Sequence, residues 1–211
     1  MIANLLYWFE LLAVAVFALT GAIVAAQNKM DPVAYVILAV VTGIGGGTIR
    51  DALLSTPAFW LSDPADLLMC AAVAIVVFVS RATFVELERN PGPWRVLPWA
   101  DAIGLALFAV VGAERALVAG AHPISAIVLG TVTATFGGVV RDVFIGQTTL
   151  IVKREIYITA AMLAASVYVL IYYVLGNAVL AALLGFAAGF CLRAAAVLFK
   201  WTLPTVEGWK K

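Results

Sequence analysis

The sequence predicts an all-α polytopic membrane protein with seven transmembrane helices, arranged as a 3+3 inverted repeat plus a seventh helix. Three observations predict this class. The 211 residues are 64% hydrophobic and only 12% charged, whereas soluble domains carry about 25% charged residues. The apolar residues form runs of the roughly 20 residues that a bilayer span requires. Finally, one motif occurs at matching positions in the two halves of the chain.

The composition also excludes several classes of function. A formal net charge of +1 argues against nucleic acid as a partner. Cys70 and Cys191 lie inside apolar runs and are expected to pack there, rather than form a disulfide or bind a metal. With one histidine in the chain and no metal-ligand spacing, we expect no enzyme activity, no cofactor and no metal site.

Three spans are expected in the first half. The first, Leu5 to Gln27, is retained as a helix because the first basic residue, Lys29, follows it, whereas a signal peptide carries its positive charge in front. The second, Pro32 to Leu53, begins with a proline, which suits the first turn of a helix. The third apolar run extends from Asp66 to Phe84.

Four spans are expected in the second half. They run from Pro98 to Ala119, Pro123 to Ile145, Glu155 to Leu175 and Ala178 to Lys200. Seven spans place the two termini on opposite sides of the membrane. Basic residues gather in the connections on one side, at Lys29, Arg81, Arg89, Arg95, Lys153, Arg154, Lys200, Lys210 and Lys211. By the positive-inside rule the N-terminus is expected outside and the C-terminus in the cytoplasm.

An internal repeat links the two halves. A shift of 91 positions (101 minus 10) aligns Glu10 to Leu54 with Asp101 to Ile145 without a gap, and 14 of the 45 pairs are identical. The aligned residues include Gly46, Gly47, Arg50 and Asp51 with Gly137, Gly138, Arg141 and Asp142. Because each copy has three spans, the second copy must enter the membrane from the opposite face, as in many transport proteins.

These boundaries predict a first repeat over residues 4–86, an inverted second repeat over 95–176 and a seventh helix over 177–202. In transport proteins with this architecture the solute path lies where the two copies meet. A helical bundle duplicated for stability alone remains the alternative.

Glycines inside the second and fifth spans are candidate pore residues. They are Gly45, Gly46, Gly47, Gly137 and Gly138. Consecutive glycines allow a helix to bend or break, and a carbonyl freed in this way can bind a dehydrated cation. The alternative is close helix packing through small residues. A nucleotide site is excluded, because neither a preceding strand nor a Gly-Lys-Ser or Gly-Lys-Thr motif is present.

Polar side chains beside these glycines are further candidates. Hydroxyls of Thr42, Thr48 and Thr133 can face an ion, although threonines in membrane helices more often bond to their own backbone. Charged side chains inside a membrane are expected to be paired or hydrated. We therefore expect two mirror-related clusters, which either line a pore or lock helices together: Glu10 with Arg50 and Asp51, and Asp101 with Arg141 and Asp142.

The doubled glycine-arginine-aspartate motif resembles the prokaryotic branch of the trimeric intracellular cation (TRIC) channels, a sequence family also labelled as glycine transporters. The resemblance implies a homotrimer in a prokaryotic inner membrane, surrounded by lipids. Each protomer would have its own pore, lined by the first, second, fourth and fifth helices, with the second and fifth kinked at their glycines. The resemblance further implies permeation of K⁺ and, less selectively, Na⁺.

The residues before the glycines differ from those of the animal members. The animal members bind phosphoinositides through lysine-bearing motifs near these glycines, whereas Ile44 and Phe136 precede the glycines here. A secondary transporter of glycine or another small amino acid is the alternative function, and the pattern of charges does not decide between the two.

Overall fold

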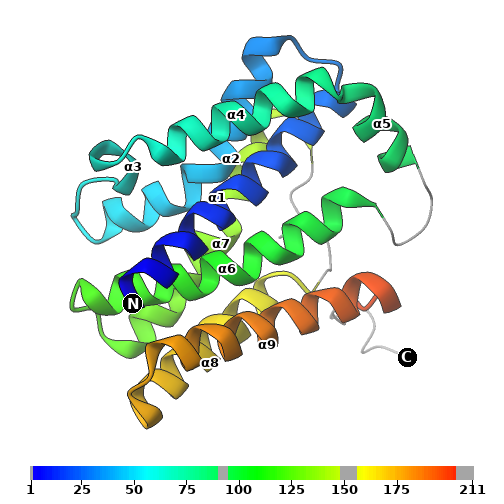
Figure 1. Ribbon diagram of the computed structural model, residues 1–211. Helices are drawn as coiled ribbons and strands as arrows, with labels where there is room; N and C mark the ends of the chain where they lie inside the picture. The colour runs from blue at the N-terminus through cyan, green and yellow to red at the C-terminus, as the bar shows by residue number, and fades with distance from the viewer. Residues whose placement is uncertain (1, 90–94, 148–155, 203–211) are drawn as a thin grey trace.

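The computed structural model describes residues 2–89, 95–147 and 156–202, and these ranges contain nine helices (Figure 1). In chain order they are α1 (Ile2–Gln27), α2 (Pro32–Leu53), α3 (Phe59–Ser62), α4 (Ala65–Val79), α5 (Arg81–Arg89), α6 (Val96–Val118), α7 (Pro123–Phe144), α8 (Ile158–Leu175) and α9 (Ala178–Phe199). The basic residues Lys153, Arg154, Lys210 and Lys211, on which the predicted orientation partly rests, lie outside the described ranges.

Six helices are long and apolar enough to cross a membrane, namely α1, α2, α6, α7, α8 and α9, and the bent pair of α4 and α5 makes a seventh candidate. The fold class is therefore as predicted. The third span differs from its prediction, because the helix stops at Val79 and α5 turns away by 77°. Four of the nine residues of α5 are charged, which makes this segment too polar for the bilayer core.

The helix boundaries follow from local chemistry. Asp31 caps α2 by accepting a hydrogen bond from the Ala34 amide at 2.9 Å, and Pro32 occupies the first turn, where no amide donor is needed. His122 caps α7 in the same way, ahead of Pro123. The corresponding helices α2 and α7 thus both begin with a side-chain N-cap that is followed by a proline.

Four helices form a ring. α1 packs against α2 and α6, and α7 packs against the same two helices, while contacts across the ring are few. The third long helix of each half packs outside this ring in an equivalent way, with α4 against α1 and α2, and α8 against α6 and α7. α9 has no counterpart and packs on α8 and α6 (Figure 1).

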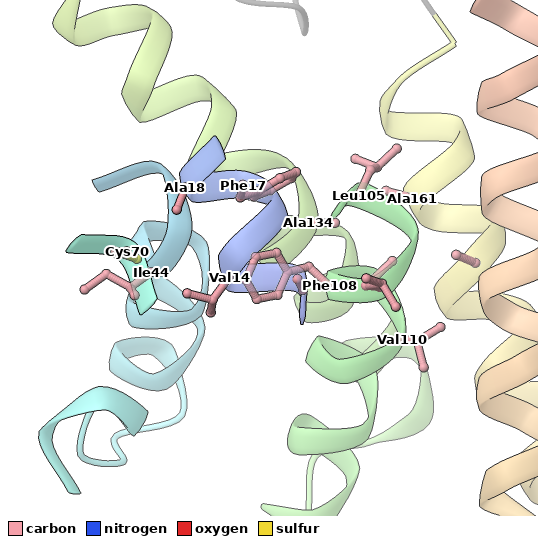
Figure 2. Packing of buried hydrophobic residues seen from close by; sticks show 14 of the residues in the cluster. Val14, Phe17, Ala18, Ile44, Cys70, Leu105, Phe108, Val110, Ala134 and Ala161 are labelled. Carbon is pink, nitrogen blue, oxygen red and sulfur yellow. The ribbon is translucent and has the colours of Figure 1, made fainter. Parts of the chain in front are cut away.

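The two halves of the ring run in opposite directions. Glu10, early in α1, forms an ion pair with Arg115 in the last turn of α6. Thr20, further along α1, bonds to Arg141 near the end of α7. Phe17 and Phe108, which the repeat aligns with each other, meet with ring centroids 5.2 Å apart in the buried core (Figure 2). These contacts are those of an inverted repeat.

Candidate functional site

The structure brings Glu10, Arg50 and Asp51 together, and we call these three residues the Glu10 cluster. Arg50 is fully buried, and its Nε donates a hydrogen bond of 2.7 Å to Asp51 Oδ1. Its Nη2 lies 3.7 Å from Glu10 Oε1. The second oxygen of Asp51 accepts a hydrogen bond of 2.9 Å from the Phe59 amide, so the short helix α3 is tied to the cluster.

Arg115 also contributes to this cluster, and sequence reasoning did not place it there. Its Nη2 donates to Glu10 Oε2, and its side chain is 46% exposed. Two more carboxylates interact electrostatically with this group: Asp66 and Glu114. The sequence signal was that Arg115 is the main basic residue on the side of the membrane where the connections carry few basic residues.

The structure likewise brings Asp101, Arg141 and Asp142 together, and we call these the Asp101 cluster. Arg141 Nη2 lies 2.8 Å from Asp142 Oδ1, and its Nη1 lies 3.9 Å from Asp101 Oδ1. The same Nη1 donates a hydrogen bond of 3.0 Å to the Thr20 hydroxyl. Both clusters thus have an arginine that is bonded to the next residue and faces a carboxylate from the first helix of its own repeat.

Two residues of the second half extend the Asp101 cluster without a counterpart in the first half. The Tyr157 hydroxyl donates to Asp101 Oδ1 at 3.4 Å, and both side chains are buried. The Arg193 guanidinium of α9 lies 5.2 Å from the centre of the Tyr157 ring. Neither residue was predicted. Arg193 is on α9, which lies outside the repeat, and the shift of 91 positions aligns Tyr157 with Asp66, an unlike residue.

The glycine motifs meet where α2 and α7 cross. A Cβ added at Gly46 would clash with the Thr133 carbonyl oxygen, and one added at Gly137 would clash with the Thr42 carbonyl oxygen. The repeat relates these two contacts to each other. Both helices remain α-helical through the crossing, and the glycines allow close backbone approach there.

The remaining glycines of the motifs have different neighbours. Gly45 is partly exposed, and the nearest atom to an added Cβ is the Gly137 Cα, at 4.0 Å. A Cβ at Gly47 would lie 2.5 Å from the Phe59 ring, and one at Gly138 would lie 3.1 Å from the Tyr157 hydroxyl. Gly47 and Gly138 therefore let an aromatic residue pack beside each cluster.

The candidate threonines direct their hydroxyls to their own helices. Thr42 donates to the Leu38 carbonyl at 2.5 Å, and Thr133 donates to the Leu129 carbonyl at 2.7 Å. Thr48 donates to the Ile44 carbonyl and also accepts a hydrogen bond from the Trp60 indole at 2.9 Å. In this structure the three hydroxyl protons are thus used for backbone bonds, and the hydroxyl oxygens keep lone pairs.

Phe17 and Phe108 lie between the two clusters. Each follows the acidic residue of its repeat, Glu10 or Asp101, by seven residues, which is about 10 Å along a helix. The Phe17 ring also packs closely on Gly104 and Gly137. The ring of four helices is therefore charged at both ends and apolar in the middle. The repeat alignment paired the two phenylalanines, but nothing in the sequence marked them as part of a site.

Comparison with known proteins identifies the family. The sequence model of a family described as "Glycine transporter" matches residues 7–82 and 98–173. The second match begins and ends 91 residues after the first (98 minus 7 and 173 minus 82). The inner membrane protein YadS of Escherichia coli K12 is 37% identical to the chain over 95% of its length, and the match covers 96% of YadS.

Two solved structures are similar to this chain over most of its length. The trimeric intracellular cation channel orthologue from Rhodobacter sphaeroides is 43% identical, with a TM-score of 0.87 over 94% of this chain and 100% of that one. The chain belongs to the TRIC family. A second TRIC channel, from a study of conductance, is 33% identical, with a TM-score of 0.81 over 93% of this chain and 95% of that one.

Membership of the TRIC family agrees with the surface of the molecule. The chain is a multi-pass membrane protein, and large apolar side chains point outward along α4, at Leu68, Ile75 and Val79, with exposures of 60% to 72%. Such a surface is suited to contact with lipid. The two family matches have the same spacing as the repeat found in the sequence.

Proposed function

We propose that this protein is a channel for monovalent cations, K⁺ foremost, with one pore in each protomer of a homotrimer. The observation that carries the proposal is the placement of the two charged clusters at opposite ends of the ring formed by α1, α2, α6 and α7. Similarity to cation channels supports this assignment, since the relatives of known structure are TRIC cation channels.

The proposed pore runs along the ring from the Glu10 cluster to the Asp101 cluster. Both clusters belong to one chain, so a single protomer holds both ends of the path. Charged groups at the two ends would be hydrated when the path opens, because charges inside a membrane are either paired or hydrated. Between them, the apolar layer of Phe17 and Phe108 resists water, and a hydrophobic constriction of this kind can close a channel by dewetting.

The conformation described here fits a closed channel. α2 and α7 touch through Gly46 and Gly137 with no room for an ion between their backbones. Opening then requires these helices to separate or to bend at the glycines, as proposed for the second and fifth spans. The carbonyls of Thr42 and Thr133, now packed on glycine, would then become available to a cation.

The charges around the Glu10 cluster support a preference for cations. Four carboxylates, of Glu10, Asp51, Asp66 and Glu114, interact with the guanidinium groups of Arg50 and Arg115. The formal sum of these six groups is a net charge of −2. Such a field raises the local concentration of cations and lowers that of anions. The preference for K⁺ over Na⁺ rests on the resemblance to TRIC channels.

Flux through purified protein in liposomes tests the proposed function. A K⁺ gradient should drive a current in planar bilayers and collapse a membrane potential in vesicles. Labelled glycine, tested in parallel, should not accumulate. Saturable glycine counterflow without K⁺ current would contradict the channel and favour the carrier.

The position of the pore is tested by widening its middle. Phe17→Leu and Phe108→Leu should each raise K⁺ flux, because a smaller side chain weakens the apolar closure. Phe186→Leu is the matched control, since Phe186 lies on α9, outside the ring. Unchanged flux in folded Phe17→Leu and Phe108→Leu proteins would move the pore away from this layer.

A further inference from the structure

We propose that the buried Glu10 carboxylate is a binding site for a monovalent cation and that Arg115 is a tethered competitor for this site. The inference deepens the proposed function and rests on it, because the bound cation is the permeant one. Arg115 would occupy the site in the closed conformation and leave it when K⁺ enters. The cation and the guanidinium would thus exclude each other at Glu10.

Unequal burial within this ion pair is the first observation. The Glu10 side chain is 5% exposed, whereas the Arg115 side chain is 46% exposed. A buried carboxylate needs a positive partner, so Arg115 leaves only when another cation takes its place. The half-exposed guanidinium of Arg115 is itself easily hydrated in water. Arg115 can therefore leave without unfolding the helix that carries it.

The hydrogen bonds of the Glu10 cluster are the second observation. Glu10 Oε1 is buried and accepts no hydrogen bond, and the buried Arg50 Nη1 and Nη2 donate none. Glu10 Oε1 and Arg50 Nη2 face each other at 3.7 Å. Buried polar atoms normally have a partner. A cation that replaces Arg115 at Oε2 could also bind Oε1, so it would use both oxygens of Glu10, whereas Arg115 bonds to one.

Charge balance is the third observation. Two carboxylates, of Glu10 and Asp51, share the buried guanidinium of Arg50. Without Arg115 the Glu10 cluster has a formal charge of −1, which one monovalent cation neutralises. Arginine and K⁺ carry the same charge, so their exchange leaves the electrostatics of the pore end unchanged.

The Asp101 cluster lacks this arrangement. Within residues 2–89, 95–147 and 156–202, the cationic side chains near it belong to Arg141 and Arg193, and both residues are buried, with exposures of 3% each. Arg193 also stacks on Tyr157 and donates to the Ile156 carbonyl at 3.5 Å. Neither arginine can rotate into water without rearrangement of α7 or α9. The exchangeable counter-ion is therefore specific to the Glu10 end.

The experiment measures K⁺ current in planar bilayers over a series of KCl concentrations, with choline chloride holding the ionic strength constant. Arg115→Gln should lower the half-saturating K⁺ concentration about fivefold, which corresponds to about 1 kcal/mol of lost competition. Arg115→Lys keeps a tethered charge but loses the planar fork, so its half-saturating concentration should lie between those of the wild type and Arg115→Gln.

Two controls make the result specific. In a Glu10→Gln background, Arg115→Gln should produce no further shift, because the site has already been removed. Arg95→Gln is the matched variant: Arg95 is 41% exposed in its side chain and pairs at 3.1 Å with Glu88, whose side chain is 2% exposed, but this pair lies away from the proposed site. It should leave the half-saturating concentration unchanged.

The outcomes separate this inference from the proposed function. An unchanged or raised half-saturating concentration in Arg115→Gln would overturn the competition, as would an equal shift in the Glu10→Gln background. A wild-type protein that conducts no K⁺ would contradict the proposed channel function, whatever the currents of its variants.

Discussion

At the scale of single residues, the absence of a side chain decides how closely the two repeats approach. Gly46 and Gly137 each lie against the backbone of the opposite repeat. Backbone atoms cannot rotate aside as a flexible side chain can, so an added methyl group must push α2 and α7 apart. Gly45 lies one residue away, and an added methyl group there meets no atom closer than 4.0 Å.

Gly46→Ala and Gly137→Ala should therefore each lower the free energy of unfolding by about 1–3 kcal/mol, the usual cost of overpacking. Thermal unfolding of the purified protein in detergent, followed by circular dichroism, measures the change. Gly45→Ala is the matched control and should be neutral or stabilising by up to about 1 kcal/mol, because alanine favours a helix over glycine. A Gly46→Ala protein as stable as Gly45→Ala would contradict the close crossing.

Pairing of charges could be predicted at this scale from sequence alone, because the repeat fixes which residues correspond and helix length fixes their depth. Glu10 and Arg50 are an example, since the sequence predicts them in one cluster. Arg115 was not assigned to Glu10, because its aligned residue is Val24 and the repeat carries no information about it. The break in α2 was expected from glycine content, but the same glycines serve packing.

At the scale of elements, α5 connects the two repeats through the side chain of Glu88. Glu88 is buried, and its Oε1 accepts a hydrogen bond of 2.8 Å from the Leu97 amide in the first turn of α6. Its Oε2 accepts from Arg95 Nε at 3.1 Å and from Gln27 Nε2 at 3.4 Å. One carboxylate thus caps α6 and joins it to the end of α1.

Glu88→Ala should lower the free energy of unfolding by about 2 kcal/mol, because it leaves an amide and an arginine without their charged acceptor. Glu86→Ala is the control on the same helix, since Glu86 and Arg89 form an ion pair in which both side chains are 73% exposed, and such pairs contribute about 0–1 kcal/mol. The same thermal measurement compares them. Equal losses of unfolding free energy in the two variants would contradict the capping role of Glu88.

The bend between α4 and α5 shows what hydropathy patterns leave undetermined. The window from Asp66 to Phe84 is apolar on average, and an average cannot show that the charge begins abruptly at Arg81. Glu88 then holds α5 against the start of α6, a contact between distant parts of the sequence. Local patterns predict spans, whereas the direction of a short polar helix depends on such tertiary contacts.

At the scale of the whole molecule, the proposed orientation places the Glu10 end outside the cell. Ser62, at the end of α3, and Thr83, on α5, are both exposed and lie at opposite ends of α4. In a background with Cys70→Ala and Cys191→Ala, Ser62→Cys should react with a membrane-impermeant maleimide on intact cells. Thr83→Cys should react only after the membrane is permeabilised. The reverse pattern would invert the orientation.

α9 makes the whole molecule asymmetric, and the repeat could not predict how. It packs mainly on α6 and α8 of the second half and touches α1 through Phe9 and Phe186, and Arg193 on α9 reaches the Asp101 cluster through Tyr157. The two ends of the proposed pore therefore differ in what their arginines can do, although their central residues are repeated.

The reciprocal contacts at the helix crossing have a consequence for the origin of the chain. Gly46 contacts Thr133, and Gly137 contacts Thr42 in the same way. The contacts at the crossing are therefore the same when the two repeats are interchanged. Two separate three-helix polypeptides of identical sequence would form the same seam only if one of them inserted upside down. Such a precursor would have needed dual topology, with little bias in the charges that flank its helices. After gene fusion, each half could acquire its own charge bias.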